Sequence, residues 1–350
     1  MAKKVLILSP LSDQGLAVAR YLLKYGNGYA LHGGFMPGEA MTKHSYYEKV
    51  LCVQDISTVS GYDIVLPTGA KSTRWMAEQF GEFHVNDISY CKENLLYFDK
   101  PRIISLVKDL GVPVPKTFEN IVAIDIPLPV FYKQKFEEGG GPRGLASSFA
   151  QLEQLQSKER LIYQEYIPGG ITYGMGFIAK SGDIITSFQH EELLSYPIQG
   201  GSAVYIRTFW DERIREYTER IIKALQFSGW GLAEYKYCLK RQDYVFMEIN
   251  AKLWASIEFA FMNNSDFMHH LFGIDYKANN VKSAVFINRF IALGWRQMVR
   301  HVPQLLNASK YIYYHNTGSL IRSFISITIP HKLKRFLKNV LLQRRGLNKA

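Results

Sequence analysis

The segment from residue 232 to residue 250 combines two alternating runs with a short polar linker. It reads LAEYKYCL, then KRQD, then YVFMEIN. This pattern predicts an antiparallel β-hairpin. If the hairpin is symmetric about Arg241, Glu234 lies directly across from Glu248. Because side chains alternate along a strand, Glu248 and Asn250 share one face.

Two opposed carboxylates repel each other unless a cation lies between them. Two carboxylates, an amide oxygen and nucleotide phosphates form a suitable ligand shell for Mg²⁺, and Mn²⁺ accepts the same ligands. The hairpin therefore predicts a metal site with Glu234, Glu248 and Asn250 as ligands. The alternative is that Lys236 or Lys252 neutralises the pair as an ordinary surface charge.

The first 90 residues alternate short apolar strands with amphipathic helices, which predicts a small doubly wound sheet. The predicted strands cover residues 3–9, 29–32, 50–53, 64–66 and 84–85, and the predicted helices residues 14–25 and 73–80. In the turn after the first strand Gly15 stands alone, so the glycine fingerprint of dinucleotide-binding domains is missing. A further helix is predicted over residues 100–110.

A predicted strand over residues 129–133 ends in Lys133 and leads into a glycine-rich loop. Gly139, Gly140 and Gly141 carry no Cβ, so their N–H groups can approach an anion closely. A lysine just upstream supplies a positive charge for the same phosphates. The loop lacks the ending of a Walker loop, and a flexible surface hairpin is the alternative interpretation.

Five motifs in order, within a similarity that runs over residues 1–275, resemble the ATP-grasp superfamily. They are FDKP with LGVPVPKT (98–101 and 110–117), PVFYK with the glycine loop (129–144), LIYQEYIPG (161–169), GLAE (231–234) and FMEINAK (246–252). The resemblance is to its carboxylate–amine ligases, such as the D-aspartate ligase, biotin carboxylase and carbamoyl phosphate synthase types. It implies an α/β fold: a small doubly wound pre-ATP-grasp domain, a two-lobed α+β ATP-grasp domain and a basic helical C-terminal tail. The expected domains are residues 1–90, residues 91–275 (a lid lobe over about 117–165 and a metal-binding lobe over about 166–275) and residues 276–350.

The resemblance also implies a role for individual residues. The expected ATP-binding residues are Lys100, Lys133, Gly139, Gly140, Gly141 and Gly144 at the phosphates, and Gln164, Glu165 and Ile167 at the adenine. Glu234, Glu248 and Asn250 are the expected Mg²⁺ ligands, and Lys252 the residue that faces an acyl phosphate. His190 and Arg207 are candidates for the substrate end of the site.

Three positions depart from the family pattern. Lys252 stands where an arginine is usual, and Glu192 replaces a basic residue. The acid that binds ribose after the adenine hinge is missing near Ile171 and Thr172. A lysine keeps the charge of arginine but loses its planar fork, so these changes favour an altered substrate or weakened catalysis.

The activity implied is ATP-dependent activation of a carboxylate as an acyl phosphate, followed by its transfer to an amine with formation of a C–N bond. Such chemistry needs positioning and charge neutralisation rather than a protein nucleophile. Two alternatives remain open: a phosphotransferase on the same scaffold, and a catalytically weakened ATP-binding, membrane-associated protein of cell-envelope polysaccharide assembly. Small-molecule acid and amine substrates are expected, and a homodimer remains open.

The charge of the chain is concentrated at its C-terminal end. The formal net charge is +11, yet Asp275 is the last acidic residue, and 14 of the 42 lysines and arginines follow it. The first 275 residues are slightly acidic, so we expect no nucleic-acid partner. Cys52, Cys91 and Cys238 form no motif for a disulfide framework or a zinc site, which favours a reducing compartment.

Residues 330–345 form a basic amphipathic pattern. Its apolar stripe contains Leu333, Phe336, Leu337, Val340 and Leu341. Such a helix suits an anionic membrane surface, and packing on the body or on a second copy is the alternative. With no secretory signal and no bilayer-spanning run visible, we expect a cytoplasmic protein, with peripheral attachment to the inner face of the membrane left open.

Overall fold

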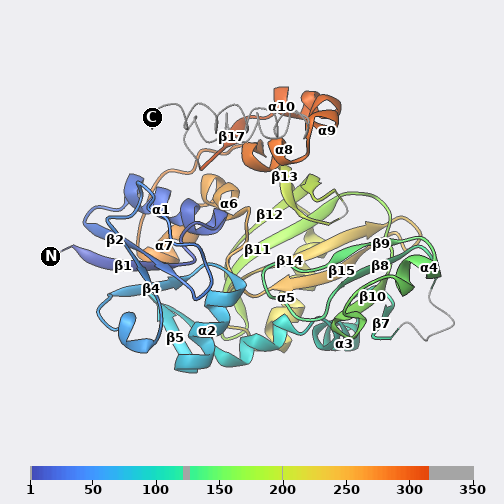
Figure 1. Cartoon of the computed structure of the whole chain (residues 1–350), viewed down its shortest axis with the longest axis horizontal. Helices are drawn as coiled ribbons and strands as arrows, with labels where there is room; N and C mark the ends of the chain where they lie inside the picture. Colours follow the sequence, from blue (N-terminus) through green and yellow to red (C-terminus); the bar gives the residue numbers. More distant parts are fainter. Residues whose placement is uncertain (1, 121–126, 199, 315–350) are drawn as a thin grey trace, which may run out of the picture.

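The computed structural model describes residues 2–120, 127–198 and 200–314. The chain begins with a parallel four-stranded sheet in the order β3-β2-β1-β4 (Figure 1). Its elements are β1 (Lys3–Leu8), α1 (Asp13–Tyr25), β2 (Tyr29–Phe35), β3 (Lys49–Cys52), the turn η1 (Ile56–Thr58), β4 (Ile64–Pro67) and α2 (Ala70–Phe80). The predicted helices and the first four predicted strands are confirmed. The fifth predicted strand, at residues 84–85, does not join this sheet, because it pairs with the following strand in a separate antiparallel sheet. Ser12 begins α1 as its N-cap, with its side chain accepting a hydrogen bond from the Gly15 N–H.

A short antiparallel pair and a helix lead from this unit to the rest of the chain. They are β5 (Glu82–Val85), β6 (Ile88–Cys91), the turn η2 (Lys92–Phe98) and α3 (Lys100–Asp109). Asp99 caps α3 by accepting from the Arg102 N–H, and a proline occupies the first turn. The cap therefore fixes Lys100 in the first turn, where it is buried.

The next segment forms a small antiparallel sheet in the order β7-β10-β8-β9. Its elements are β7 (Thr117–Phe118), β8 (Val130–Gln134), β9 (Arg143–Ala146), α4 (Phe149–Glu153), the turn η3 (Lys158–Arg160) and β10 (Leu161–Glu165). Val130, Leu161 and Tyr163 form its core with α4. The predicted glycine-rich loop connects β8 to β9.

A seven-stranded sheet forms the centre of the molecule, in the order β15-β14-β11-β12-β13-β16-β17. Its strands are β11 (Thr172–Lys180), β12 (Asp183–Tyr196), β13 (Ser202–Thr208), β14 (Gly229–Cys238), β15 (Asp243–Asn250), β16 (Ser283–Phe286) and β17 (Lys310–Ile312). Phe177, Phe227 and Phe246 are fully buried against α3 and α5 (Glu212–Ala224). The β14–β15 ladder places Glu234 opposite Glu248, which confirms the predicted pair. The hairpin is not symmetric about Arg241, however, because Cys238 pairs with Asp243 and a bulge between Glu234 and Tyr235 shifts the register by one residue.

Five helices come from the last part of the chain, and among them α6 joins the large sheet to the N-terminal unit. They are α6 (Ile257–Asn263), α7 (Asp266–Phe272), α8 (Ile287–Ala292), α9 (Trp295–Arg300) and α10 (Val302–Leu306). Tyr21 of α1 packs against Phe261 of α6 with ring centroids 5.2 Å apart, and one hydrophobic core spans both units. The predicted amphipathic tail over residues 330–345 lies outside the described residues. Within the ranges that the structure covers, no helix is both long and apolar enough to cross a bilayer.

A buried ion pair ties α1 to α6. Arg20 Nη1 donates to Glu258 Oε1 at 2.7 Å, and the Glu258 side chain is only 1% exposed. Arg20 Nε also donates to the Tyr46 hydroxyl at 3.2 Å. A carboxylate withdrawn from water to this extent requires a cation partner, so the pair holds the N-terminal unit against the rest of the molecule.

Replacing Arg20 with methionine should destabilise the protein by about 3 kcal/mol, because it leaves the Glu258 carboxylate buried without a cation. Urea unfolding followed by circular dichroism measures this change. The control is Arg213→Met, which breaks the exposed pair with Asp243 and should cost less than about 1 kcal/mol. Equal costs for the two variants would contradict the role given to the α1–α6 pair.

Candidate functional site

A cleft of about 560 Å³ lies where the N-terminal unit, the small sheet and the large sheet meet. Many of the residues singled out from the sequence line it: Lys100, Lys133, Gly139, Gly140, Gly141, Glu234, Glu248, Asn250 and Lys252. They come from α3, β8, the β8–β9 loop, β14 and β15. The fold thus brings the predicted phosphate and metal residues together in one place.

The opposed carboxylates have different electrostatic surroundings. Lys133 Nζ lies 2.8 Å from Glu248 Oε2. Burial alone would raise the pKa of Glu248, but the ammonium groups of Lys133 and Lys100 outweigh it and lower this pKa. Burial and the carboxylates of Glu248 and Glu192 raise the pKa of Glu234 well above its usual range. A divalent cation between the pair would remove this repulsion.

The oxygen atoms of Glu234, Glu248 and Asn250 suit a magnesium ion that binds together with a nucleotide. Asn250 Nδ2 lies 3.4 Å from Glu248 Oε1, so the amide adjoins the carboxylate pair. No cluster of three or more His, Cys, Asp or Glu side chains suited to a metal occurs in the described part of the chain. Mg²⁺ is commonly held by one or two carboxylates together with substrate phosphates, so a pair of glutamates and an amide oxygen suffices.

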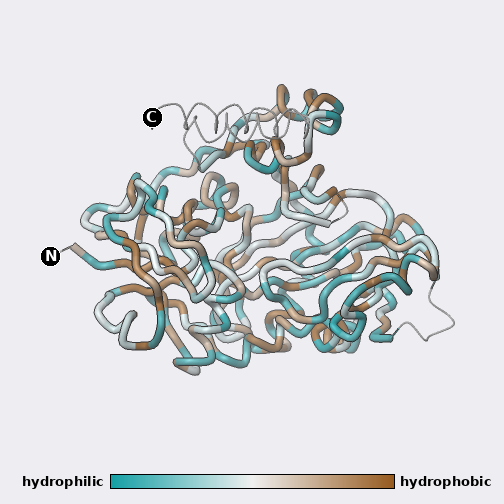
Figure 2. The backbone as a smooth tube through the Cα atoms, in the orientation of Figure 1, coloured by the Kyte–Doolittle hydropathy of each residue, from teal (hydrophilic) through white to brown (hydrophobic). Residues whose placement is uncertain are grey.

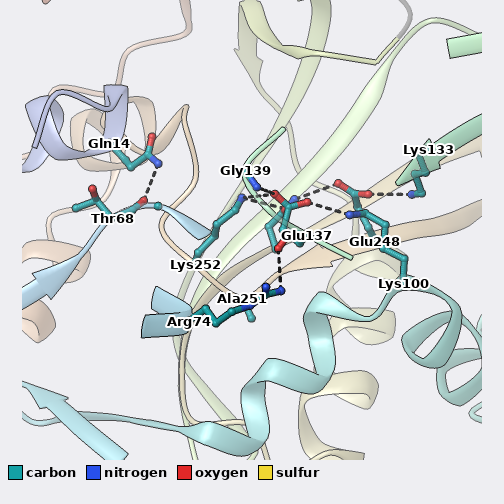
Figure 3. A network of polar contacts seen from close by, with 12 residues as sticks. Gln14, Thr68, Arg74, Lys100, Lys133, Glu137, Gly139, Glu248, Ala251 and Lys252 are labelled. Atoms are coloured by element: carbon teal, nitrogen blue, oxygen red, sulfur yellow. Dashed lines mark hydrogen bonds and ion pairs between the residues drawn. The ribbon is translucent and has the colours of Figure 1, made fainter. Parts of the chain in front are cut away.

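The Glu137 carboxylate lies between two lysines of the cleft, Lys100 and Lys252 (Figure 3). Its Oε2 atom lies 2.9 Å from Lys100 Nζ and its Oε1 atom 3.6 Å from Lys252 Nζ. The Gly139 N–H donates to Oε1 at 3.0 Å. Burial would raise the pKa of Glu137, but Lys252 and Lys100 lower it. Glu137 therefore neutralises the lysines that were expected to meet phosphate and acyl phosphate.

The β8–β9 loop depends on glycine for its path. Gly139 and Gly141 have φ values of +81° and +109°. A Cβ at Gly141 would lie 1.7 Å from Gln134 Oε1, so no other residue fits there without a shift. The Glu137 N–H donates to the Phe98 carbonyl at 2.9 Å, which sets Glu137 next to α3, and the turn at Gly139 brings its N–H to the Glu137 carboxylate.

The N-terminal unit supplies a wall of the cleft that the motifs did not reveal. Ser9, Ser12 and Lys71 line it near the carboxyl ends of β1 and β4 and the first turns of α1 and α2. Ser9 Oγ donates to Glu39 Oε1 at 2.7 Å. Gln14 Nε2 donates to the Thr68 carbonyl at 2.6 Å, and Figure 3 shows this contact. Ligands of open α/β sheets bind at the carboxyl ends of the strands. The position of these residues directly after the predicted strands was therefore the sequence signal that could have identified them.

The residues predicted for the adenine lie outside the cleft lining. Gln164 is fully buried and its Nε2 donates to Thr117 Oγ1 at 3.0 Å. Glu165 pairs with Arg241, while Ile167 packs against Met247 and its neighbours. Their roles at a nucleotide stay predictions.

Gly144, predicted at the phosphates, also lies outside the cleft lining, because it belongs to β9 and pairs with Tyr132 of β8.

His190 and Arg207 do not line the cleft, whereas Glu192 does. The His190 side chain is 2% exposed, and its Nε2 lies 3.6 Å from Glu192 Oε1. Arg207 Nε donates to Glu191 Oε1 at 2.6 Å. Neighbouring strand residues point to opposite faces, so the partnership with Glu191 directs Arg207 away from Glu192.

Solved structures share the fold of this chain. It is similar to a Campylobacter jejuni biotin carboxylase solved as a β,γ-ATP complex, at 16% identity and a TM-score of 0.57, covering 81% of this chain and 74% of that one. It is also similar to an L-amino acid ligase from Bacillus licheniformis, at 12% identity and a TM-score of 0.56, covering 79% and 76%.

A third similar structure is a Rhizobium etli pyruvate carboxylase, at 15% identity and a TM-score of 0.56, covering 73% of this chain. The chain spans only 27% of the length of that enzyme. Neither a protein-family model nor a curated protein sequence matches the chain. The biotin carboxylase and the L-amino acid ligase are ATP-grasp carboxylate–amine ligases, and this chain has the ATP-grasp fold, as the sequence resemblance implied.

Changing Glu137 to glutamine should tighten the binding of ATP by roughly tenfold, because the nucleotide no longer displaces a charged competitor from Lys100 and Lys252. Titration calorimetry of the full chain with ATP measures the affinity. The matched control is Glu138→Gln, since Glu138 lies in the same loop but pairs with Arg160. Unchanged or weaker binding to the Glu137 variant would contradict the competition.

Proposed function

We propose that the protein is an ATP- and Mg²⁺-dependent ligase that joins a carboxylate to an amine. The observation that carries this proposal is the opposed pair Glu234 and Glu248 inside a cleft that is also lined by five lysines and a glycine-rich loop. Lysines and loop N–H groups suit phosphates, and the carboxylates suit the metal that accompanies them. The ATP-grasp fold, shared with an L-amino acid ligase, supports the same activity.

Each group then has a defined task. Lys100 and Lys133 hold the phosphates of ATP, and Glu234 and Glu248, with Asn250, hold Mg²⁺. The metal, when bound, neutralises charge on the transferring phosphoryl group.

Lys252 is placed to stabilise the acyl phosphate formed when the substrate carboxylate attacks the γ-phosphate. Its ammonium group lies 3.1 Å from Asn250 Oδ1 and 3.6 Å from Glu137, so it adjoins both the metal ligands and the loop. Once Glu137 withdraws, this cation faces the space where negative charge develops in the reaction. The amine then displaces phosphate, which leaves a C–N bond.

The substrates bind at the end of the cleft formed by the N-terminal unit. Ser9, Ser12 and Lys71 line this end together with Ser256 from the opposite wall. Hydroxyl groups and an ammonium group recognise acids and hydroxylated compounds. We therefore propose small polar acids, including amino acids and sugar acids, as the class of substrate.

Release of ADP across a panel of paired acids and amines tests this function. Turnover should require both partners and Mg²⁺. Hydroxylamine should trap the activated acid as a hydroxamate, since an acyl phosphate reacts with it. ADP release with phosphate transferred to a hydroxyl group, and no hydroxamate, would instead identify a phosphotransferase. ATP binding without turnover of any pair would contradict the enzymatic role.

Changing Glu248 to glutamine should lower ADP release by at least about 100-fold, because a ligand of the metal is lost where charge must be neutralised. The affinity for ATP, measured in Mg²⁺ and in EDTA, should become nearly equal. Glu219→Gln, which makes the same charge change on the exposed face of α5, should leave both properties unchanged. A Mg²⁺-dependent affinity that survives in the Glu248 variant would contradict the metal assignment.

A further inference from the structure

A stripe of exposed apolar side chains runs along α9 and α10. It consists of Trp295, Val299, Val302 and Leu306, and we refer to these four residues as the outer stripe. Their exposed fractions are 56%, 67%, 38% and 73%. Large apolar side chains that gather on one surface of a soluble domain mark a site of interaction.

Helices α9 and α10 follow each other with His301 between them. The His301 N–H donates to the Gln297 carbonyl at 3.0 Å, and the Leu305 N–H donates to the His301 carbonyl at 3.3 Å, so His301 ends one helix and begins the next. Residues four apart lie on one side of a helix. Trp295 and Val299 therefore share one side of α9, and Val302 and Leu306 share one side of α10.

Neighbouring positions of the same two helices anchor them to the body. Met298 and Leu305 pack against the buried cluster that contains Val204, Val285 and Phe290. Each of them is next in sequence to a residue of the outer stripe, so the apolar surface of the helices continues from this buried contact onto exposed side chains.

The charged residues within α9 and α10 are all basic. Arg296 and Arg300 belong to α9, and the Arg296 guanidinium lies 5.5 Å from the centre of the Trp295 ring. No Asp or Glu occurs anywhere in the sequence after Asp275. A surface of exposed apolar residues flanked by arginines and free of acids complements an anionic lipid headgroup layer.

Figures 1 and 2 show where the outer stripe lies in the molecule. Helices α8 to α10 form a projection beyond the central sheet, and hydrophobic stretches of α9 and α10 lie at its periphery. A projecting helix can meet a flat surface without moving the cleft lobes. A tryptophan in such a helix suits the boundary between headgroups and acyl chains.

We propose that the outer stripe of α9 and α10 docks the protein on an anionic membrane surface, with Trp295, Val299 and Leu306 entering the headgroup boundary and Arg296 and Arg300 contacting lipid phosphates. This surface is distinct from the basic pattern over residues 330–345. It does not depend on the ligase activity, because none of these residues lines the cleft.

Vesicle flotation of the full chain tests the docking surface. Vesicles of phosphatidylglycerol and phosphatidylethanolamine should bind the protein, and vesicles of phosphatidylcholine alone should not. The triple variant Trp295→Ser, Val299→Ser, Leu306→Ser should partition at least about tenfold less strongly, because it removes the apolar surface that enters the lipid. Arg296→Gln with Arg300→Gln should weaken binding to the anionic vesicles by roughly 30-fold, since each basic residue contributes about 1 kcal/mol.

The matched control removes three exposed apolar side chains on other elements: Ile56→Ser, Trp210→Ser and Leu239→Ser. It should bind anionic vesicles as the unmodified chain does. Brominated acyl chains should also quench the emission of Trp295, with Trp295→Phe as the reference, and this readout does not depend on stability.

Three results would overturn the proposal. One is equal binding of the outer-stripe variant and the unmodified chain, which would assign any binding to another segment. Another is the absence of binding to anionic vesicles, or equal binding to phosphatidylcholine. The third is a dimer that the triple variant converts to a monomer without any effect of lipid, which would make the outer stripe an interface between copies of this chain.

Discussion

The arrangement of this molecule depends on a set of acidic and basic side chains that neutralise one another in the cleft. Glu234 and Glu248 are forced together by the β14–β15 register, and Glu137 joins them from the β8–β9 loop. Lys133 lies against Glu248, and Lys100 and Lys252 lie against Glu137. Removing one member would leave a charge without its partner in a site of low water content, so the set is interdependent. ATP and Mg²⁺ together would replace these contacts, with phosphates taking the lysines and the metal taking the glutamates.

Folding brings these charged side chains together from distant parts of the sequence. The cap at Asp99 fixes Lys100, the turn at Gly139 brings its N–H to the Glu137 carboxylate, and the Arg20–Glu258 pair holds the N-terminal unit against α6. The cleft thus depends on three separate structural elements. In contrast, the outer stripe lies on helices that contribute no residue to the cleft. Substitutions that change membrane docking therefore need not change the reaction in the cleft.

Much of the fold and part of the site could be predicted from the sequence. Alternating residues and a short turn were enough to place Glu234 across from Glu248, since both signals are local. The parallel sheet followed from the alternation of strands and helices. The contact of Glu137 with two lysines could not be predicted, because it joins residues that tertiary folding brings together.

The direction in which individual side chains point also could not be predicted from the sequence. Sequence order could not show that Gln164 turns toward Thr117, that Arg207 pairs with Glu191, or that Ser9 and Lys71 line the far end of the cleft. Each of these depends on which face of a strand or which sheet edge meets the cleft. Such contacts follow from packing between units and have no local signature.

A crystal structure with Mn²⁺ and a non-hydrolysable ATP analogue is the most direct measurement of the central claim. Anomalous scattering should place Mn²⁺ between Glu234 and Glu248, with Lys133 contacting phosphate in place of Glu248 and Glu137 withdrawn from Lys100. A metal bound elsewhere, or an analogue that leaves the Lys133–Glu248 pair intact, would contradict the account.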